Sequence, residues 1–242
     1  DRITPATTPA DMSYLQQQVG IKDEWPVTCE PFHQWIIEDK FTLARPQWEQ
    51  VGAQFVADVT PYENMKIRLL NAGHSVLGIL GSLHGFSTID ESVQDPVFAQ
   101  FLRHFMDTEV TPILPHVAGI NLYEYKDSLL TRFANPNIKD SLARICSENA
   151  AKLSTFMLPT IVENLAVKGQ ISCATLVLAA WCYYSDKQTD QQGKALTISD
   201  AMAVELHQAA SQTTERPLAL LELSSIFSKL TCHKEFVVAY KQ

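Results

Sequence analysis

Four polar residues recur at short spacing within one segment of the chain, namely Glu63, Lys66, Asn71 and His74. An α-helix advances about 100° per residue, so the last three lie at about 300°, 80° and 20° relative to Glu63. An acid, an amine, an amide and an imidazole would therefore share an arc of roughly 140° on one helix face. Groups of these types suit reactions at an alcohol or a carbonyl.

Each of these groups has a specific chemical use. A lysine removed from water can have its pKa lowered toward neutrality and act as a general base. An asparagine N–H can stabilise a developing alkoxide. A histidine can orient a hydroxyl or pass a proton, and a neighbouring glutamate can take part in proton release. Spacing alone, however, favours the plainer interpretation, a solvated face of an amphipathic helix.

The element that carries these residues is predicted to be a long helix over residues 61–84. Pro61 suits its start and Gly85 its end. Glycines at 73, 78 and 81 disfavour a helix, so we expect close approach by another helix or a ligand. Apolar residues repeat every three or four positions on the opposite face: Met65, Leu69, Ala72, Val76, Leu80 and Leu83.

The rest of the chain is predicted to be mainly α. A short helix is expected from Pro9 to Gly20. Two strand-like runs, 34–38 and 54–58, are expected to pair as a small antiparallel ribbon. Further helices are expected over 95–109, 110–117, 121–132, 138–150, 153–168, 171–184, 199–213 and 215–228. Without a repeat or a dividing linker, the pattern predicts one helical domain over 1–242 with a small β appendage near residues 34–58.

Composition and charge disfavour several classes of protein. The 242 residues are 46% hydrophobic, and 19 Lys and Arg against 27 Asp and Glu give a formal net charge of −8. An acidic globular chain without a basic block is not expected to bind nucleic acid. No apolar run reaches about 18 residues, so no membrane span is expected. The histidines lack metal-ligand spacing, and we expect no metal site.

The cysteines and the start of the chain bear on its setting. Five scattered cysteines without a CxxC pair argue against structural zinc or a disulfide scaffold, and they suit a reducing cytoplasm. The sequence opens at Asp1 without a signal-peptide pattern. We therefore expect a cytoplasmic protein, as a fragment or a processed product of a longer chain.

The segment around the four polar residues resembles a known catalytic signature. Residues 66–74, KIRLLNAGH, form the pattern K-x(4)-N-x(2)-H, which is similar to that of the long-chain mannitol dehydrogenase family. This family of polyol and hexuronate dehydrogenases includes mannitol 2-dehydrogenases and fructuronate reductases (mannonate oxidoreductases). The resemblance extends over most of residues 1–165, through DRITP at 1–5, CEPFHQWIIED at 29–39, PYENMK at 61–66 and RFANP at 132–136.

The resemblance implies roles for the four polar residues. Lys66 would be the general base that takes the proton from the substrate hydroxyl. Asn71 would help to form an oxyanion pocket, and His74 would orient the reacting oxygen. Glu63, one helical turn before the lysine, would assist proton exchange with solvent.

The resemblance also implies three substrate-binding residues, Arg144, Lys152 and Asp1. Arg144 and Lys152 lie eight positions apart, so on one helix they would share a face. A break near residue 150 would relax that inference. Asp1 would lie near the reacting centre.

One feature of the family is missing from this sequence. The family binds NAD or NADP through an N-terminal Rossmann domain with a glycine-rich turn and uses no metal, but no GxGxxG occurs here. The resemblance therefore implies the C-terminal, multihelical substrate domain, of the 6-phosphogluconate dehydrogenase C-terminal type. We expect it to be active only together with an N-terminal Rossmann domain.

The substrate remains open among small polyols and sugar acids. Mannitol to fructose is the first expectation, and mannonate to fructuronate is the alternative, since the K-x(4)-N-x(2)-H core is shared. Arg144 and Lys152 could pair with a uronate carboxylate, but polyol enzymes carry comparable bases. An alternative of another class is a non-catalytic helical module that binds a sugar acid or a partner protein.

Overall fold

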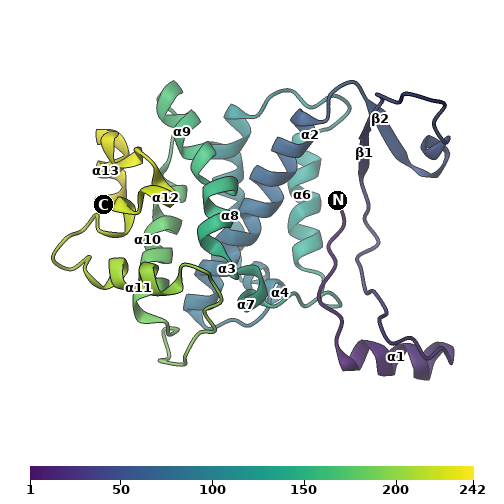
Figure 1. Ribbon diagram of the computed structural model, residues 1–242, viewed down its shortest axis with the longest axis horizontal. Helices are drawn as coiled ribbons and strands as arrows, with labels where there is room; N and C mark the ends of the chain where they lie inside the picture. Colours follow the sequence, from purple (N-terminus) through teal and green to yellow (C-terminus); the bar gives the residue numbers. More distant parts are fainter.

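The computed structural model describes residues 1–242, which form an extended arm (residues 1–59) beside a helical body (residues 60–242) (Figure 1). The arm contains α1 (Pro9–Val19), β1 (Trp35–Glu38), the 3-10 helix η1 (Trp48–Val51) and β2 (Ala53–Val56). The multihelical architecture with a small β appendage confirms the predicted fold class.

Helix α1 begins and ends where the sequence predicts. Thr8 and Asp11 form a capping box, in which the Thr8 N–H donates to the Asp11 carboxylate at 2.7 Å. Gly20 ends the helix in a left-handed conformation with φ of 73°, which glycine adopts without a steric penalty.

The two strands pair in parallel, so the expected antiparallel ribbon is wrong. Trp35 lies opposite Ala53 and Glu38 lies opposite Val56, which means that both strands run in the same direction. Parallel strands need a crossover of roughly a dozen residues or more, and residues 39–52, which include η1, supply it. The sequence placed the strands correctly, but it contains no hairpin turn that would have reversed the chain.

The long helix predicted over 61–84 is present, and it contains an unpredicted π segment. It consists of α2 (Thr60–Met65), the π helix η2 (Lys66–Asn71) and α3 (Ala72–His84), here called together the central helix. Its apolar face is completely buried at Met65, Leu69, Ala72 and Val76. The helix therefore forms because it packs this face into the core.

The glycines of the central helix allow close approach by its neighbours. A Cβ atom at Gly78 would lie 2.8 Å from Cγ2 of Ile145, and one at Gly81 would overlap Ser92. Substitution would push neighbouring elements apart, which explains why glycine is present despite its low helix propensity. The expected close approach is thus by other helices.

The remaining helices surround the central helix, with α11 and α13 packed on the outside against α10 (Figure 1). Asp95 and Asn121 cap α5 and α6, as each side chain accepts a hydrogen bond from a backbone N–H of the first turn. In chain order these helices are α4 (Ile89–Gln94), α5 (Pro96–Phe105), the π helix η3 (Met106–Val110), the 3-10 helix η4 (Thr111–Ile113), α6 (Leu122–Phe133), α7 (Leu142–Ile145), α8 (Asn149–Phe156), α9 (Leu158–Val167), α10 (Ser172–Lys187), α11 (Ala203–Ser211), the 3-10 helix η5 (Leu220–Glu222), α12 (Ser224–Phe227), the 3-10 helix η6 (Leu230–Cys232) and α13 (Lys234–Lys241).

Several predicted helices are broken or shortened. The helix expected over 138–150 starts later and is divided: Lys139, with φ of 46°, precedes α7, and Glu148, with φ of 53°, separates α7 from α8. The helix expected over 153–168 is divided at Met157, because Pro159 lacks an N–H and cannot continue the preceding turn. The helices expected over 110–117 and 215–228 are reduced to η4 and to the short η5 and α12, while α4 and α13 were not predicted.

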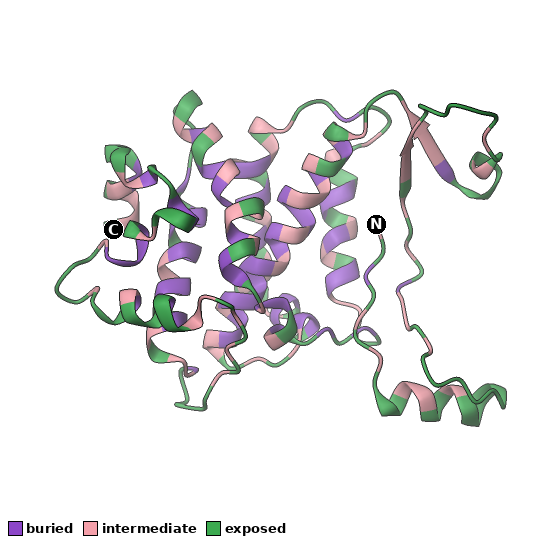
Figure 2. Ribbon diagram, in the orientation of Figure 1, coloured by how far each residue is buried: buried purple, intermediate pink, exposed green.

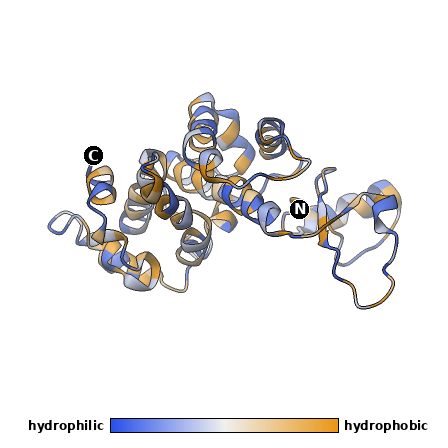
Figure 3. Ribbon diagram, turned by 90° about the horizontal axis from the view of Figure 1, so that it is seen from above, coloured by the Kyte–Doolittle hydropathy of each residue, from blue (hydrophilic) through white to orange (hydrophobic).

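The hydrophobic core lies almost entirely in the body. Of its 44 buried residues, Ile3 is the one that precedes Tyr62. Buried residues concentrate in the body, whereas the arm is largely exposed (Figure 2). Seen from above, the arm extends to one side of the helices (Figure 3). None of the helices combines the length and apolarity needed to cross a membrane.

Candidate active site

The π segment of the central helix holds two of the predicted site residues at its ends, Lys66 and Asn71. Its wider turn is visible where the Ala72 N–H bonds to the carbonyl of Ile67, five residues earlier. A π turn changes the angular spacing, so a 100° step does not describe the face between Lys66 and Asn71. Such segments frequently occur at functional sites, because they re-aim side chains without ending the helix.

Lys66 is half-buried, and the pKa of its side-chain amine is lowered. Burial lowers its pKa below the usual 10.5, and the positive charge of Arg132 lowers it further. Both effects act against the ammonium form. They increase the fraction of neutral amine, which is the form that can accept a proton.

The His74 imidazole, two turns further along the central helix, is kept neutral. Burial is the main cause that lowers its pKa to about 3, and the charges of Arg144, Arg132, Lys66 and Lys152 add to it. The ring lies 4.5 Å from that of Phe133. Its Nε2 atom is buried without a hydrogen-bond partner in the chain. A buried polar atom without a partner suggests that a bound ligand completes it.

A cavity of about 180 Å³ joins four of the predicted residues. Asn71 and His74 line it from the central helix, Arg144 from α7 and Lys152 from α8. Its remaining lining is Ser75, Asp140, Ile145 and Phe156. The structure therefore brings an amide, a neutral imidazole and two bases from separate helices around one space.

Arg144 and Lys152 do not share one helix, because the chain turns between α7 and α8. The turn itself brings them together. Lys152 Nζ donates to the carbonyl of Ile145 at 2.9 Å and to that of Arg144 at 3.4 Å, which satisfies the C-terminal end of α7. Arg144 Nε donates to the Asp140 carboxylate at 2.6 Å, and Asp140 is itself buried.

Asp1 lies on the arm side of the site, outside the cavity lining. Its carboxylate accepts a hydrogen bond from Arg132 Nη2 at 3.1 Å, and its main-chain nitrogen donates to the carbonyl of Gln34. Lys66 lies within electrostatic range of the Asp1 main-chain nitrogen.

Glu63 is exposed on α2, one turn before Lys66. No hydrogen bond or ion pair connects its carboxylate to another side chain. Its expected part in proton exchange stays a prediction.

Three residues that the sequence did not single out belong to this region: Arg132, Glu30 and Tyr125. Arg132 and Glu30 form a buried ion pair, with Nη2 to Oε1 at 2.8 Å. Tyr125 is buried nearby, and its hydroxyl has no partner. Arg132 and Glu30 lie within the CEPF and RFANP stretches that resemble the family, and this was the signal that could have indicated them.

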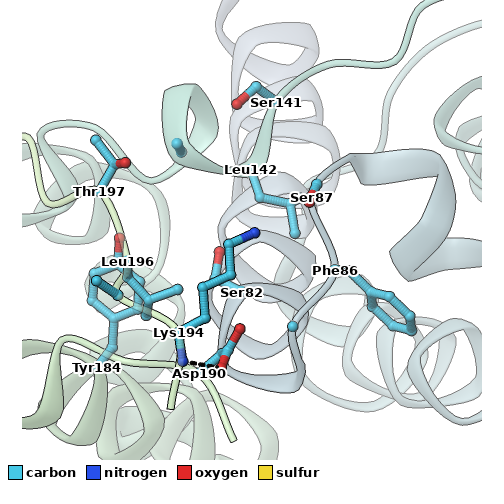
Figure 4. Close-up of a pocket in the computed structure, with 13 residues that line it drawn as sticks. Ser82, Phe86, Ser87, Ser141, Leu142, Tyr184, Asp190, Lys194, Leu196 and Thr197 are labelled. Carbon is cyan, nitrogen blue, oxygen red and sulfur yellow. Dashed lines mark hydrogen bonds between the residues drawn. The ribbon is translucent and has the colours of Figure 1, made fainter. Parts of the chain in front are cut away.

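A second hollow, of about 220 Å³, lies at the other end of the central helix (Figure 4). Ser82, Tyr184, Asp190 and Lys194 are among its lining residues. It contains none of the predicted site residues. Elsewhere, no group of three or more His, Cys, Asp or Glu side chains is placed where it could hold a metal ion.

The chain matches two family profiles. Residues 58–242 match the profile of the mannitol dehydrogenase C-terminal domain, and residues 1–50 match that of the mannitol dehydrogenase Rossmann domain. The boundary between the two matches lies close to the boundary between arm and body.

Named relatives agree with these profiles. A mannitol 2-dehydrogenase of Phaeosphaeria nodorum is 42% identical over 100% of this chain and 42% of its own length. Mannitol dehydrogenase 2 of Saccharomyces cerevisiae is 43% identical over 98% of this chain and 47% of its own length. The chain spans about half the length of the curated relatives it matches.

Two solved structures share the fold. The Pseudomonas fluorescens mannitol 2-dehydrogenase ternary complex with NAD and D-mannitol superposes with a TM-score of 0.92 at 43% identity, covering 100% of this chain and 49% of that chain. A D-sorbitol dehydrogenase in substrate-free form gives a TM-score of 0.79 at 29% identity, covering 99% of this chain and 53% of that chain.

Proposed function

The chain belongs to the mannitol dehydrogenase family, and we propose that it is the substrate-binding and catalytic half of an NAD(P)-dependent polyol dehydrogenase. The reaction would be reversible oxidation of a secondary hydroxyl to a ketone. The observation that carries this proposal is the gathering of Asn71, His74, Arg144 and Lys152 around one cavity, with Lys66 close enough to affect the pKa of His74.

Lys66 is proposed as the general base. Burial and the charge of Arg132 lower its pKa, so more of the amine is neutral near physiological pH than for an exposed lysine. A neutral amine can take the proton of the substrate hydroxyl as the C–H bond is broken. Glu63, one turn away at the surface, is proposed to pass that proton on to solvent.

Asn71 and His74 are proposed to hold the reacting oxygen. The Asn71 amide can donate to the oxygen as negative charge develops on it. His74 is neutral, so it can donate one hydrogen bond without giving up a proton, and its unpartnered Nε2 offers a place for the substrate hydroxyl.

Arg144, Lys152 and Asp1 are proposed to bind the other substrate hydroxyls. Arg144 and Lys152 border the cavity, while Asp1 is held beside it by Arg132. Together they supply donors on one side and a carboxylate acceptor on the other. A polyol needs both, because each hydroxyl can donate and accept.

The residues of this chain do not by themselves fit the cofactor. Its helical glycines serve packing, since a Cβ at Gly78 would strike Ile145, and no glycine-rich turn is present for a pyrophosphate. A bound nicotinamide cofactor supplies the hydride acceptor in such an oxidation. The residues that hold it, and the choice of NAD or NADP, are therefore proposed to lie in an N-terminal Rossmann domain.

The arm is proposed to be the part of this chain that meets that domain. Its residues 1–50 match the Rossmann-domain profile, and it exposes large apolar side chains such as Trp25 and Leu43. In this proposal residues 1–242 fold as one helical domain, and packing of the arm against the nucleotide-binding domain covers those side chains.

Mannitol is the proposed first substrate. The relatives named above act on mannitol by name. The Asp140 carboxylate pairs with Arg144 and offsets its positive charge, which disfavours a hexonate carboxylate at that point, while Arg144 Nη1 keeps a donor for a neutral hydroxyl. Mannonate oxidation to fructuronate is the alternative.

The test is a substrate panel with the full-length protein. Mannitol, arabinitol, mannonate and altronate are each assayed with NAD and with NADP. We expect mannitol to give the highest kcat/KM, and a preference for mannonate would move the assignment to the alternative. No turnover on any of the four, or an upstream coding region without a strand followed by GxGxxG, would favour a non-catalytic binding module.

A further inference from the structure

We infer that Arg132, held in place by Glu30, is a positioning residue for this site that fixes the Asp1 carboxylate and keeps Lys66 in its proton-accepting form. Arg132 lies in the last turn of α6 and does not line the cavity. The inference rests on the proposed function, in which Lys66 is the base.

Four hydrogen bonds fix the Arg132 guanidinium, one of them from Nε to Glu30 Oε1 at 3.2 Å. Its Nε donates to Glu30 Oε2 at 2.9 Å, and its Nη2 donates to Glu30 Oε1 at 2.8 Å and to Asp1 Oδ2 at 3.1 Å. The side chains of Arg132, Glu30 and Asp1 are only 6%, 2% and 9% exposed. A bidentate, water-excluded pair of this kind has one geometry, so Asp1 is held at one position.

The surroundings prevent this network from rotating. The Phe32 ring lies 3.9 Å from the guanidinium carbon, and Glu30 also accepts a hydrogen bond from the Ile3 N–H at 2.6 Å. Burial raises the pKa of Tyr125 to about 12, and the Arg132 guanidinium acts against this rise, which places the buried Tyr125 hydroxyl against Arg132.

The charge of Arg132 reaches the reacting groups. After burial, it is the charge that lowers the pKa of Lys66, and it also contributes to the lowered pKa of His74. Arg132 acts on Lys66, and Arg144, Arg132, Lys66 and Lys152 act on His74. Asp1 and Glu30 on the arm and Tyr125 on α6 contact Arg132, while Glu63 and Arg68 flank Lys66 on the central helix. Arg132 is the body residue whose side chain forms hydrogen bonds with the two arm carboxylates, Asp1 and Glu30.

A second buried arginine provides a matched control. Arg68 lies two residues after Lys66, its side chain is 10% exposed, and both terminal nitrogens lie 2.5 Å from the Glu163 carboxylate. It does not contribute to the lowered pKa of Lys66. Both arginines are buried and paired with a glutamate, but Glu163 is 44% exposed whereas Glu30 is 2% exposed, and the two arginines differ in their effect on Lys66.

The experiment measures the proton affinity of Lys66 in two ways in the full-length protein. One is the acid limb of kcat/KM for mannitol oxidation. The other is the pH midpoint of Lys66 acylation by an amine-reactive reagent, followed by peptide mass spectrometry. In Arg132→Gln we expect both to move to higher pH by about one unit, because a nearby positive charge is lost. Arg132→Lys should restore them, and Arg68→Gln should leave them unmoved.

A folded Arg132→Gln variant with wild-type midpoints, or an equal shift in Arg68→Gln, overturns the inference. If Arg132→Gln does not fold, Glu30→Gln takes its place. Glu30→Gln keeps the positive charge of Arg132 and removes the negative charge of Glu30. The acid limb of kcat/KM and the acylation midpoint of Lys66 should therefore move to lower pH, and unmoved values overturn the inference. A shifted acylation midpoint in a protein that oxidises no polyol rejects the proposed function while supporting the charge effect.

Discussion

The arm and the body are held in place by different forces. The body buries a core of 44 residues to which the arm adds Ile3. The arm leaves Trp25 78% and Leu43 85% exposed. It meets the body through a few apolar side chains, Ile3, Ile36 and Val56, and through the buried ion pairs of Arg132. The site draws on both regions, since Lys66, Asn71 and His74 belong to the body while Asp1 belongs to the arm.

This difference shows that the two regions hold their site residues in place in different ways. The central helix cannot move without disturbing the core, so its polar side chains are fixed by packing on the opposite face. Asp1 is fixed by hydrogen bonds to one arginine. We therefore expect changes on the central helix to affect the chemical step, and changes in the arm to affect positioning with little effect on core stability.

The largest expected effect is on the body side of the comparison, at Lys66. Lys66→Ala should lower kcat for mannitol oxidation by the full-length protein by about 10²–10⁴-fold, because the proposed general base is lost. Cofactor affinity, measured by fluorescence titration, should change little. Unchanged turnover at neutral pH would remove Lys66 from the base role.

A loss of similar size is expected at the other end of the π segment. Asn71→Ala should weaken transition-state stabilisation by about 2.7–4 kcal/mol if the amide donates to the developing oxyanion. Asn71→Asp is the matched control, since it keeps the size of the side chain and removes the donor. A change in KM with kcat preserved would show that Asn71 only binds substrate.

Two leucines, one in the body and one in the arm, test directly whether the free energy of unfolding depends mainly on the body. Leu69 is completely buried in the body, and Leu43 is exposed in the arm. In the 242-residue chain, Leu69→Ala should lower the free energy of unfolding by about 2–5 kcal/mol, whereas Leu43→Ala should change it by about 0.5 kcal/mol or less. Chemical denaturation followed by circular dichroism measures both, and similar losses would contradict this dependence on the body.

The smallest expected effect is that the His74 ring does not titrate over the usual pH range. Burial and neighbouring positive charges lower the pKa of His74 to about 3, so the ring should stay neutral from pH 5 to 9. Its contribution as a neutral partner is lost only as the pH falls through about 3. Histidine NMR signals recorded across this range should contain one ring that does not shift, and a His74 signal that titrates near 6.5 would show that the site is open to water.

The sequence was informative wherever local pattern decides structure. The spacing of apolar residues predicted the central helix, and Pro9 and Gly20 marked the two ends of α1. The π segment was not predictable, because the buried apolar residues across it are spaced three or four apart in sequence, as in an ordinary α-helix. The direction of the strand pair was missed because it depends on the path of the chain between the strands.

The candidate site shows the same limit. Lys66, Asn71 and His74 are close in sequence and were identified together, whereas the importance of Arg132 depends on Glu30, 102 residues away. Arg144 and Lys152 meet because the chain turns at Glu148, which neither residue's own position reveals. Tertiary contacts of this length are set by packing, and a local pattern does not contain them.

The pH dependence of kcat/KM for mannitol oxidation by the full-length enzyme, compared between the wild type and Lys66→Ala, tests the central claim most directly. We predict that the wild-type rate rises with pH through one ionisation below 10.5, since neutral Lys66 is the proton acceptor, and that this rise is absent in Lys66→Ala. The same rise in both proteins would contradict the account.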